Sequence, residues 1–197
     1  MKTSLYLTHG WLLPLLLVLS ACESYEPYPR PFGYPRIDLP VSRDYRVFEN
    51  ETCPFTFDYP AYGRVSRDQQ DSCWTDIHFA SFDLKWHITY RDAGAGHKSR
   101  STHFEEYRRL VYKHSKKATQ IRETALEVPA GRGTLFEIYG EVGTPAQLFL
   151  HDTTDSRVVM MSCYFRTAQK NDSLQPVINY VKEEMRHMAQ SLVWRTE

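Results

Sequence analysis

The order in which two kinds of apolar pattern follow one another is the feature that most restricts how this chain can fold. Phe55, Phe57 and Tyr59 alternate with other residues, which indicates a half-buried strand. The stretches 75–79 and 84–90 show the same alternation. Strands with one buried face are typical of antiparallel sheets, so this first part of the chain predicts such a sheet.

A helical pattern then interrupts the strands. Thr102 and Glu105 have the spacing of a capping box, which predicts that a helix begins at Thr102. Residues 121–128 are expected to lead from the helix end into a further strand. The apolar face of this helix, with residues spaced by three and four positions, is expected to be Phe104, Tyr107, Val111, His114, Ala118 and Ile121.

The strand pattern resumes after this helix, and a second helix follows it. Asp172 or Ser173 is expected to cap the second helix, and Pro176 suits its first turn. Its apolar face is predicted to consist of Leu174, Val177, Val181, Met185, Met188 and Leu192. The intervening strands are predicted at 135–139, 147–151 and 158–165. The last of these strands is apolar on both faces, which favours a central place in the sheet.

This order of elements predicts an α+β fold in which an antiparallel β-sheet is flanked by two main helices. It resembles the α-β-α sandwich of the PsbP/Mog1-like proteins, as a similarity of pattern only. We expect a single α+β domain over residues 45–197. An aromatic content of 14% suits a β-rich domain with broad packed faces.

The amino terminus has the parts of a secretory signal. Lys2 precedes an apolar run at 11–19 that is too short to span a bilayer, and small residues follow it. Leu19-Ser20-Ala21-Cys22 resembles the lipobox of bacterial lipoproteins, in which the Cys thiol is lipidated and the signal is cut before it. We therefore expect a signal peptide over 1–21 and a lipid on Cys22. The alternative is an ordinary signal peptide with a chance Cys at its end.

A tether is predicted between the lipid and the domain. Residues 22–44 are rich in proline and tyrosine, which favours extended structure over helix, with docking on the domain near Ile37 and Leu39. Without Lys2 of the signal, 23 basic residues balance 24 acidic ones. This near-neutral balance gives no electrostatic case for nucleic acid or anionic lipid as a partner.

The remaining cysteines suit an oxidising compartment. Cys53 and Cys73 both stand at the start of predicted strands, so we expect them to form a disulfide. Cys163 lies within the apolar strand 158–165 and is interpreted as a buried small hydrophobic residue. The chain has no Cys-x-x-Cys pair, so the cysteines do not indicate a metal site.

The sequence offers few groups with recognisable chemistry. No nucleophile elbow, phosphate loop or His-Glu-x-x-His motif occurs, and no cofactor is expected. His78 and His87 on neighbouring strands, with His151 on another strand, could serve a metal or a hydrolase, but they lack ligand spacing and are interpreted as ordinary strand histidines. The basic side of the first helix could bind an anion or a phospholipid head, although such faces are usually only solvated; it comprises Arg108, Arg109, Lys113, Lys116 and Lys117.

Two short segments match an acceptor pattern for O-glycosylation in Bacteroidota. They are Asp152-Thr153-Thr154 and Asp172-Ser173-Leu174, with Thr153 and Ser173 as the acceptor residues. Both segments also suit a plain structural role, the first in a hairpin turn and the second in a helix cap.

Several blocks of the sequence resemble the gliding-motility lipoprotein GldD family of Bacteroidota. The first is Pro29-Arg30-Pro31-Phe32-Gly33-Tyr34-Pro35-Arg36-Ile37-Asp38-Leu39-Pro40, with Tyr34-Pro35 where the family usually has Tyr-Phe. The others are Cys53–Pro60, Cys73-Trp74, Tyr112–His114 with Lys117-Ala118, Gly143–Leu150 and Asp172–Ile178. The resemblance implies an envelope lipoprotein needed for gliding and type IX secretion, with no enzyme activity and no catalytic residue.

Three functions are therefore considered. The first is a non-catalytic factor that is held to a membrane by its lipid, with its domain in the periplasm. The resemblance implies that its partners are other gliding or type IX secretion envelope proteins. The second is a lipoprotein that binds a glycan or lipid on an aromatic sheet face; a deep aromatic-lined cleft would favour it. The third is a hydrolase, which would require a cleft that joins one of the three histidines to a carboxylate.

Overall fold

The computed structural model describes residues 38–41, 43–66, 73–166 and 171–195. Its strands are β1 (Tyr45–Phe48), β2 (Phe55–Pro60), β3 (Arg64–Ser66), β4 (Trp74–Phe79), β5 (Leu84–Asp92), β6 (Ala118–Val128), β7 (Gly131–Gly140), β8 (Ala146–His151), β9 (Arg157–Phe165) and β10 (Val193–Trp194). Its helices are α2 (Arg100–Tyr112) and α3 (Asn171–Ser191), with short 3-10 turns η1 (Ala80–Phe82) and η2 (Lys113–Lys116).

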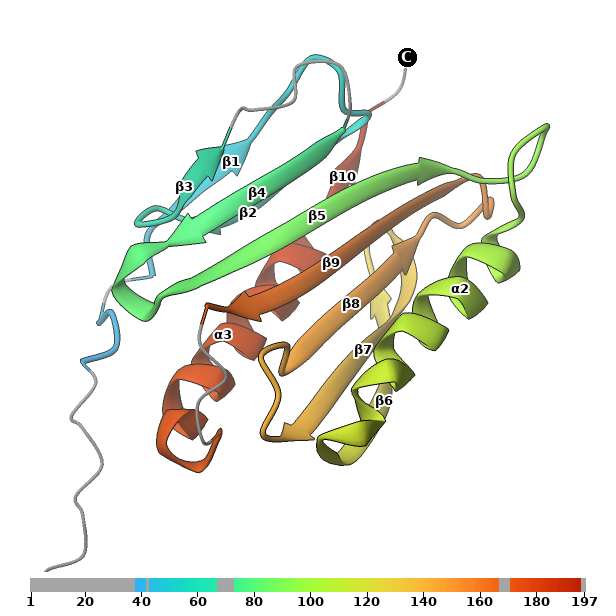
Figure 1. The fold of residues 1–197 in the computed structure, drawn as a ribbon. Coiled ribbons are helices and arrows are strands. Elements are labelled where there is room, and N and C mark those ends of the chain that lie inside the picture. The colour runs from blue at the N-terminus through green and yellow to red at the C-terminus, as the bar shows by residue number, and fades with distance from the viewer. Residues whose placement is uncertain (1–37, 42, 67–72, 167–170, 196–197) are drawn as a thin grey trace, which may run out of the picture. The chain divides into compact units, whose positions relative to one another are not determined.

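Seven strands form the main sheet in the order β3-β4-β5-β9-β8-β7-β6, and every pairing in it is antiparallel. Figure 1 shows α2 on one face of this sheet and α3 on the other. A second, three-stranded sheet of β1, β2 and β10 lies on the α3 side. The predicted α+β class, an antiparallel sheet with a helix on each side, is thus confirmed, while the small second sheet was not predicted.

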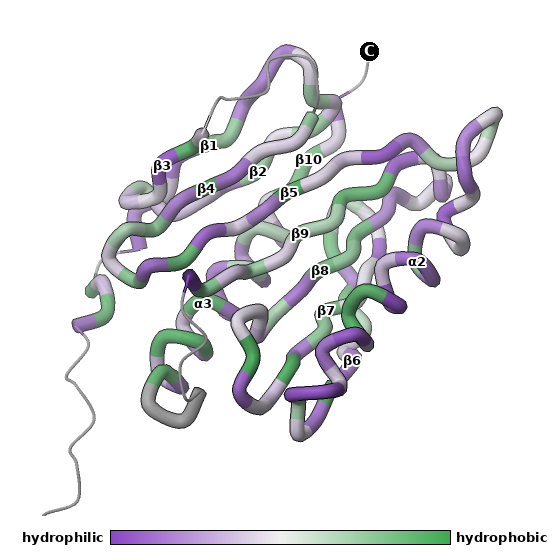
Figure 2. The backbone as a smooth tube through the Cα atoms, viewed as in Figure 1, coloured by the Kyte–Doolittle hydropathy of each residue, from purple (hydrophilic) through white to green (hydrophobic). Residues whose placement is uncertain are grey.

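The larger core lies between the main sheet, α3 and β2. Alternate residues of the strands point into it, as Ile77, Trp86, Ile88 and Met161 do, and all four are at most 1% exposed. Figure 2 shows the matching alternation of hydrophilic and hydrophobic positions along β4 and β5. β9 lies in the middle of the sheet between β5 and β8, as its two apolar faces predicted.

The predicted helix from Thr102 to Ile121 is wrong at both ends. α2 begins earlier, with Ser99 as its cap: the Ser99 hydroxyl accepts a hydrogen bond from the Thr102 amide. It ends at Tyr112, and after η2 the chain pairs with β7 as the long strand β6. Ala118 and Ile121 still pack with the α2 residues in the smaller core, but from the strand. The spacing of three and four was therefore shared by two elements that bury side chains in one cluster.

The second helix follows the prediction more closely. α3 begins at Asn171, just ahead of the two predicted cap residues, and includes Pro176 near its start. Val177, Val181 and Met185 are buried against the larger core, as the stripe predicted. Leu39, within the predicted tether, also packs against this core. No helix in the described part of the chain has the length and apolar character to cross a membrane.

Candidate functional site: a groove beside helix α2

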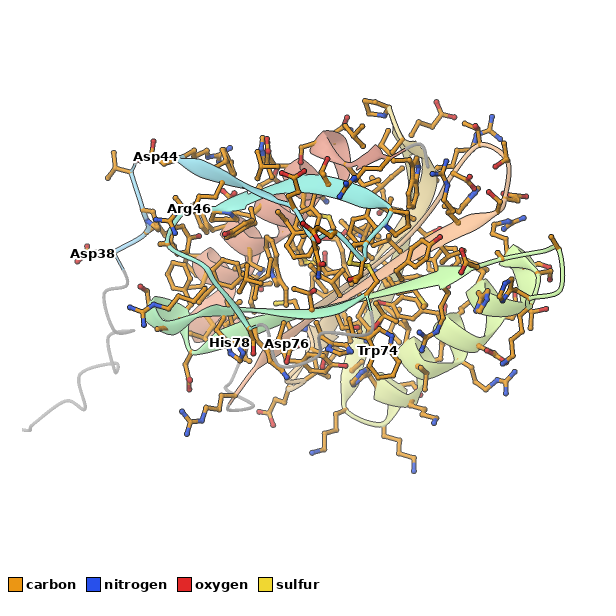
Figure 3. The ribbon with its side chains drawn as sticks, turned by 90° about the horizontal axis from the view of Figure 1, so that it is seen from above. Asp38, Asp44, Arg46, Trp74, Asp76 and His78 are labelled. Atoms are coloured by element: carbon orange, nitrogen blue, oxygen red, sulfur yellow. A yellow bond between two sulfur atoms is a disulfide. The ribbon has the colours of Figure 1, made fainter. Side chains whose placement is uncertain are left out.

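The outer face of the main sheet is covered only in part. α2 packs on β8 and β9. Phe149 and Val158 of these strands, with Phe136 of β7, form the smaller core with Tyr107 and Val111 of the helix. On the same face of β4 and β5 the side chains are exposed or half-buried: Trp74, Asp76, His78, Lys85, His87, Thr89 and Arg91. Figure 3 shows Trp74, Asp76 and His78 following one another along β4. Half of this sheet face is thus available for binding.

A groove of about 650 Å³ runs between α2 and this open half of the face. Met160 and Tyr107 line it from the sheet and the helix. Trp74 and Leu110 also line it, and they are 38% and 51% exposed. A concave surface with large, partly exposed apolar side chains is the usual form of a binding site.

The Cys53–Cys73 disulfide holds the β4 side of the groove. The bond closes a loop with a sequence separation of 20 and ties the start of β4 to the segment ahead of β2. Cys53 is 1% exposed, whereas Cys73 is half-buried and lines the groove directly before Trp74. The link therefore restricts the position of the most exposed aromatic ring of the site.

Charged groups surround the apolar lining. The Arg91 guanidinium lies 4.8 Å from the Trp74 ring centroid, a cation–π arrangement. Lys98 Nζ donates to Glu106 Oε1 at 2.6 Å, and this hydrogen bond lowers the pKa of Glu106. Among the ion pairs between described residues none includes Arg91. Arg91 Nη1 donates to the Tyr90 carbonyl at 3.2 Å, and its charge is not balanced by a carboxylate among these pairs, so its other N–H groups can meet an acceptor on a ligand.

Tyr107 fastens α2 to the sheet at the groove. Its hydroxyl donates to the Met161 carbonyl at 2.7 Å and lies 3.1 Å from Ser162 Oγ. Burial raises the pKa of Tyr107, so its hydroxyl stays protonated and serves as a hydrogen-bond donor. The helix edge of the groove is therefore held by a buried polar contact as well as by apolar packing.

A polar cluster continues the site across β4 and β5. Asp76 Oδ1 lies 2.6 Å from His87 Nδ1, and Asp76 Oδ2 accepts from Lys85 Nζ at 2.7 Å. Burial alone would raise the pKa of Asp76, but the hydrogen bonds and charges of Lys85 and His87 lower it. His87 Nε2 lies 3.3 Å from Thr89 Oγ1. An ionised carboxylate thus orients the imidazole on an accessible surface.

This cluster bears on the hydrolase hypothesis. Asp76, His87 and Thr89 supply a carboxylate, an imidazole and a hydroxyl in the order that a nucleophilic triad uses. The lining of the groove, however, includes neither His87 nor Thr89. The histidines that do line it are His97 and His103, which the sequence did not single out.

The other predicted site residues are dispersed. His78 is exposed on β4, and His151 Nδ1 lies 2.8 Å from Asp155 Oδ1 at the turn between β8 and β9. Thr153 is exposed in the turn between β8 and β9, and Ser173 falls within α3. Cys22 lies outside the described residues.

Cys163 is fully shielded from solvent, and His114 is shielded in part. Cys163 is a free thiol, fully buried on β9, and burial raises its pKa to about 12. His114 is half-buried in η2, with Nε2 3.3 Å from Gln147 Nε2, and burial lowers its pKa. Neither group lines the groove. Within the described ranges, no three His, Cys, Asp or Glu residues form a group suited to a metal ion.

Sequence reasoning missed Trp74, Arg91 and Leu110 as site residues. The alternation along β4 and β5 could have placed Trp74 and Arg91 on one face, together with Asp76 and His87. What it could not show is that α2 covers only half of that face, because this depends on where the helix packs.

The fold and the groove define the class of this protein: a small α+β domain with a helix on each face of its sheet and a recessed surface suited to recognition. Comparison with known families then gives a closer assignment. The chain belongs to the gliding motility lipoprotein GldD family, whose model matches residues 24–194.

The solution structure of cyanobacterial PsbP (CyanoP) from Synechocystis sp. PCC 6803 is similar to this chain with a TM-score of 0.49 and 8% sequence identity. The similar region covers 78% of this chain and 94% of the cyanobacterial one. A search of curated proteins found no match.

Proposed function

We propose that this chain is a non-catalytic, lipid-anchored envelope protein that supports the gliding machinery and type IX secretion. The observation that carries the proposal is the family match, which spans residues 24–194 and so includes every described element. The open groove beside α2 supports it, since a supporting protein needs a surface for its partner. The partners would be other envelope proteins of the same machinery.

The anchor in this proposal is a lipid on Cys22, with the domain on the periplasmic side of the membrane. The signal over residues 1–21 would direct export, and Cys22 would keep the domain at the membrane. Several acyl chains hold a protein stably where a single chain does not. Residues 22–44 would then serve as the tether and 45–197 as the working domain.

A deletion strain tests the function. Loss of the gene should abolish export of type IX cargo, and a wild-type copy should restore it. The Cys22→Ser protein should be expressed at the wild-type level. It should fractionate away from membranes and restore export poorly. Unchanged secretion in the deletion strain would overturn the proposal, whereas full rescue by Cys22→Ser would overturn only the role of the lipid.

The groove favours one more specific version, in which it receives an apolar side chain from a partner protein. Trp74→Ala and Arg91→Ala should lower rescue of the deletion strain at unchanged protein level. Val193→Ser is a matched control, because Val193 is 59% exposed on β10 and does not line this groove. Equal rescue by all three variants would exclude the groove from the function.

The same groove supports a second candidate, a lipoprotein that binds a glycan or lipid. Trp74 offers a partly exposed ring for apolar contact, and Arg91 offers a donor to hydroxyl or phosphate oxygens. Purified wild-type protein should then show a raised melting temperature with cell-wall glycan fragments or phospholipid micelles, and Trp74→Ala should not. No shift with either class of ligand would count against this candidate.

A further inference from the structure

A group of exposed cations lies where α2 ends. We define the α2-end patch as Arg109, Lys113, Lys116 and Lys117, all of which are exposed. No ion pair between residues of the described ranges includes any of the four. Figure 2 shows the turn after the end of this helix as hydrophilic. The neutral balance of the whole chain therefore conceals a strongly charged local surface.

The acids nearest in sequence do not neutralise this patch. Residues 105–117 contain five Lys or Arg and two Glu. One of these acids, Glu106, is bound to Lys98 at 2.6 Å. Across the strand, Glu123 Oε1 is already bound by Arg108 Nε at 2.9 Å and by the Tyr112 hydroxyl at 2.7 Å. The four patch cations keep their charge for an external anion.

Helix stabilisation accounts for only part of the patch. A cation in the last turn of a helix interacts favourably with the helix dipole, and Arg109 occupies that place in α2. The effect falls off within one turn. Lys116 and Lys117 lie at the end of η2 and after it, beyond the end of the α-helix at Tyr112.

Large apolar side chains stand among these cations. Leu110 is 51% exposed and Tyr112 is 42% exposed. The Arg108 guanidinium lies 5.3 Å from the Tyr112 ring centroid, which together with the bond to Glu123 fixes the aromatic ring at the surface. Basic side chains around an exposed aromatic and an aliphatic residue are the combination found in helices that lie on membrane surfaces.

We propose that the α2-end patch docks on the anionic phospholipid headgroups of the membrane that carries the lipid anchor. The location at a membrane rests on the proposed function. The 15 residues between Cys22 and Asp38 make 16 Cα–Cα steps and span at most about 55 Å, so the patch stays close to the bilayer at high effective concentration. Each cation near an anionic bilayer raises binding by about fivefold. Docking would set which face of the domain is turned to the periplasm.

The test uses the full mature chain, residues 22–197, with Cys22→Ser so that no lipid attaches. Its co-sedimentation is measured with vesicles of phosphatidylcholine alone and with vesicles that also contain phosphatidylglycerol. The patch variant combines Lys113→Glu, Lys116→Glu and Lys117→Glu. The control has the same change in net charge at three exposed arginines elsewhere in the fold, namely Arg46→Glu, Arg64→Glu and Arg132→Glu.

Wild type and the control should bind the phosphatidylglycerol vesicles at least about tenfold better than the neutral ones, and added salt should weaken this binding. The patch variant should lose the difference while keeping the wild-type melting temperature. Equal binding to both vesicles by wild type, or equal loss in the two variants, would overturn the inference. Vesicle binding is measured without secretion, so failure of this inference is distinguishable from failure of the proposed function.

Discussion

His87 Nδ1 and Asp76 Oδ1 lie 2.6 Å apart on the open face of the main sheet. The register of β4 and β5 places these two residues directly opposite one another, so strand pairing alone brings them together. Lys85 binds the second carboxylate oxygen of Asp76 at 2.7 Å. The carboxylate is thereby shared between two neighbours on one strand and links β4 to β5 through side chains as well as the backbone.

Replacing this carboxylate should lower stability in a pH-dependent way. The pKa of Asp76 is lower in the folded protein than its ordinary value, so its ionisation stabilises the fold above that value and ceases to do so as the pH falls. Asp76→Asn should cost about 1 kcal/mol of unfolding free energy at pH 7, because the pair is partly exposed. Urea unfolding at pH 7 and pH 3 measures the difference.

Glu127→Gln is the control for this experiment, because Glu127 is an exposed carboxylate on the edge strand β6. It should change the unfolding free energy little at either pH. If Asp76→Asn behaves like Glu127→Gln at pH 7, the contact between Asp76 and His87 does not contribute to stability.

The fold could be predicted where a pattern depends on one element and its nearest neighbour. Alternation identified β2, β4 and β5, and the apolar faces of 158–165 placed β9 at the centre of the sheet. The stripe through Phe104 to Ile121 failed because periodicity cannot tell one long helix from a helix and a strand that bury residues in one cluster.

The site could be predicted less well than the fold. Asp76 and His87 meet through strand register, which the sequence leaves open, since a shift of one strand by one residue would place the two side chains on opposite faces of the sheet. The groove depends on how far α2 extends over the sheet, and this follows from the packing of Tyr107 and Val111. The expectation of a Cys53–Cys73 bond needed less information, because it rested only on the starts of two predicted strands.

Loss of the Cys53–Cys73 bond should destabilise the domain. The bond has a sequence separation of 20, and closing a loop of this size contributes about 3 kcal/mol by restricting the unfolded chain. Cys53→Ala with Cys73→Ala should lower the unfolding free energy by about that amount, as measured by urea unfolding of the Cys22→Ser protein. A loss no larger than that caused by Cys163→Ala would contradict the expected role of the bond.

Thiol counting checks the same bond independently. In the Cys22→Ser protein without reductant, alkylation should be slow for the folded chain, because Cys163 is fully buried and its pKa is raised to about 12. Denaturant alone should release one reactive thiol, and denaturant with reductant should release three, since the chain has four cysteines in all. Three reactive thiols without reductant would refute the pairing.

We also propose O-glycosylation at Thr153 and Ser173. Thr153 is exposed in the turn between β8 and β9, whereas the neighbouring Thr154 hydroxyl donates to Asp152 Oδ2 at 2.6 Å. The protein purified from its native host should carry mass beyond its sequence and lipid, reduced stepwise by Thr153→Ala and Ser173→Ala. Thr119→Ala, which removes an exposed threonine outside the acceptor pattern, should leave the mass increment unchanged. A wild-type mass that the sequence and lipid explain fully would end the proposal.

Asp152 should be the most pH-sensitive contributor to stability in this turn. Its side chain accepts hydrogen bonds from the amides of Ser156 and Arg157 at 2.8 and 3.0 Å and from two hydroxyl groups. Burial alone would raise the pKa of Asp152, but these hydrogen bonds lower it from 3.8 to about 2. The ionised form therefore stabilises the fold fully above pH 4, and this contribution is lost as the pH falls toward 2.

Asp152→Asn removes this contribution without changing the size of the side chain. At pH 7 the variant should lose about 2 kcal/mol of unfolding free energy, because the amide nitrogen that replaces one oxygen cannot accept hydrogen bonds. Between pH 4 and pH 2 the difference from wild type should shrink, since protonation removes the same acceptor from the wild-type carboxylate. Urea unfolding across this range measures it, and a difference that stays constant would show that the ionised carboxylate is not the source of the stability.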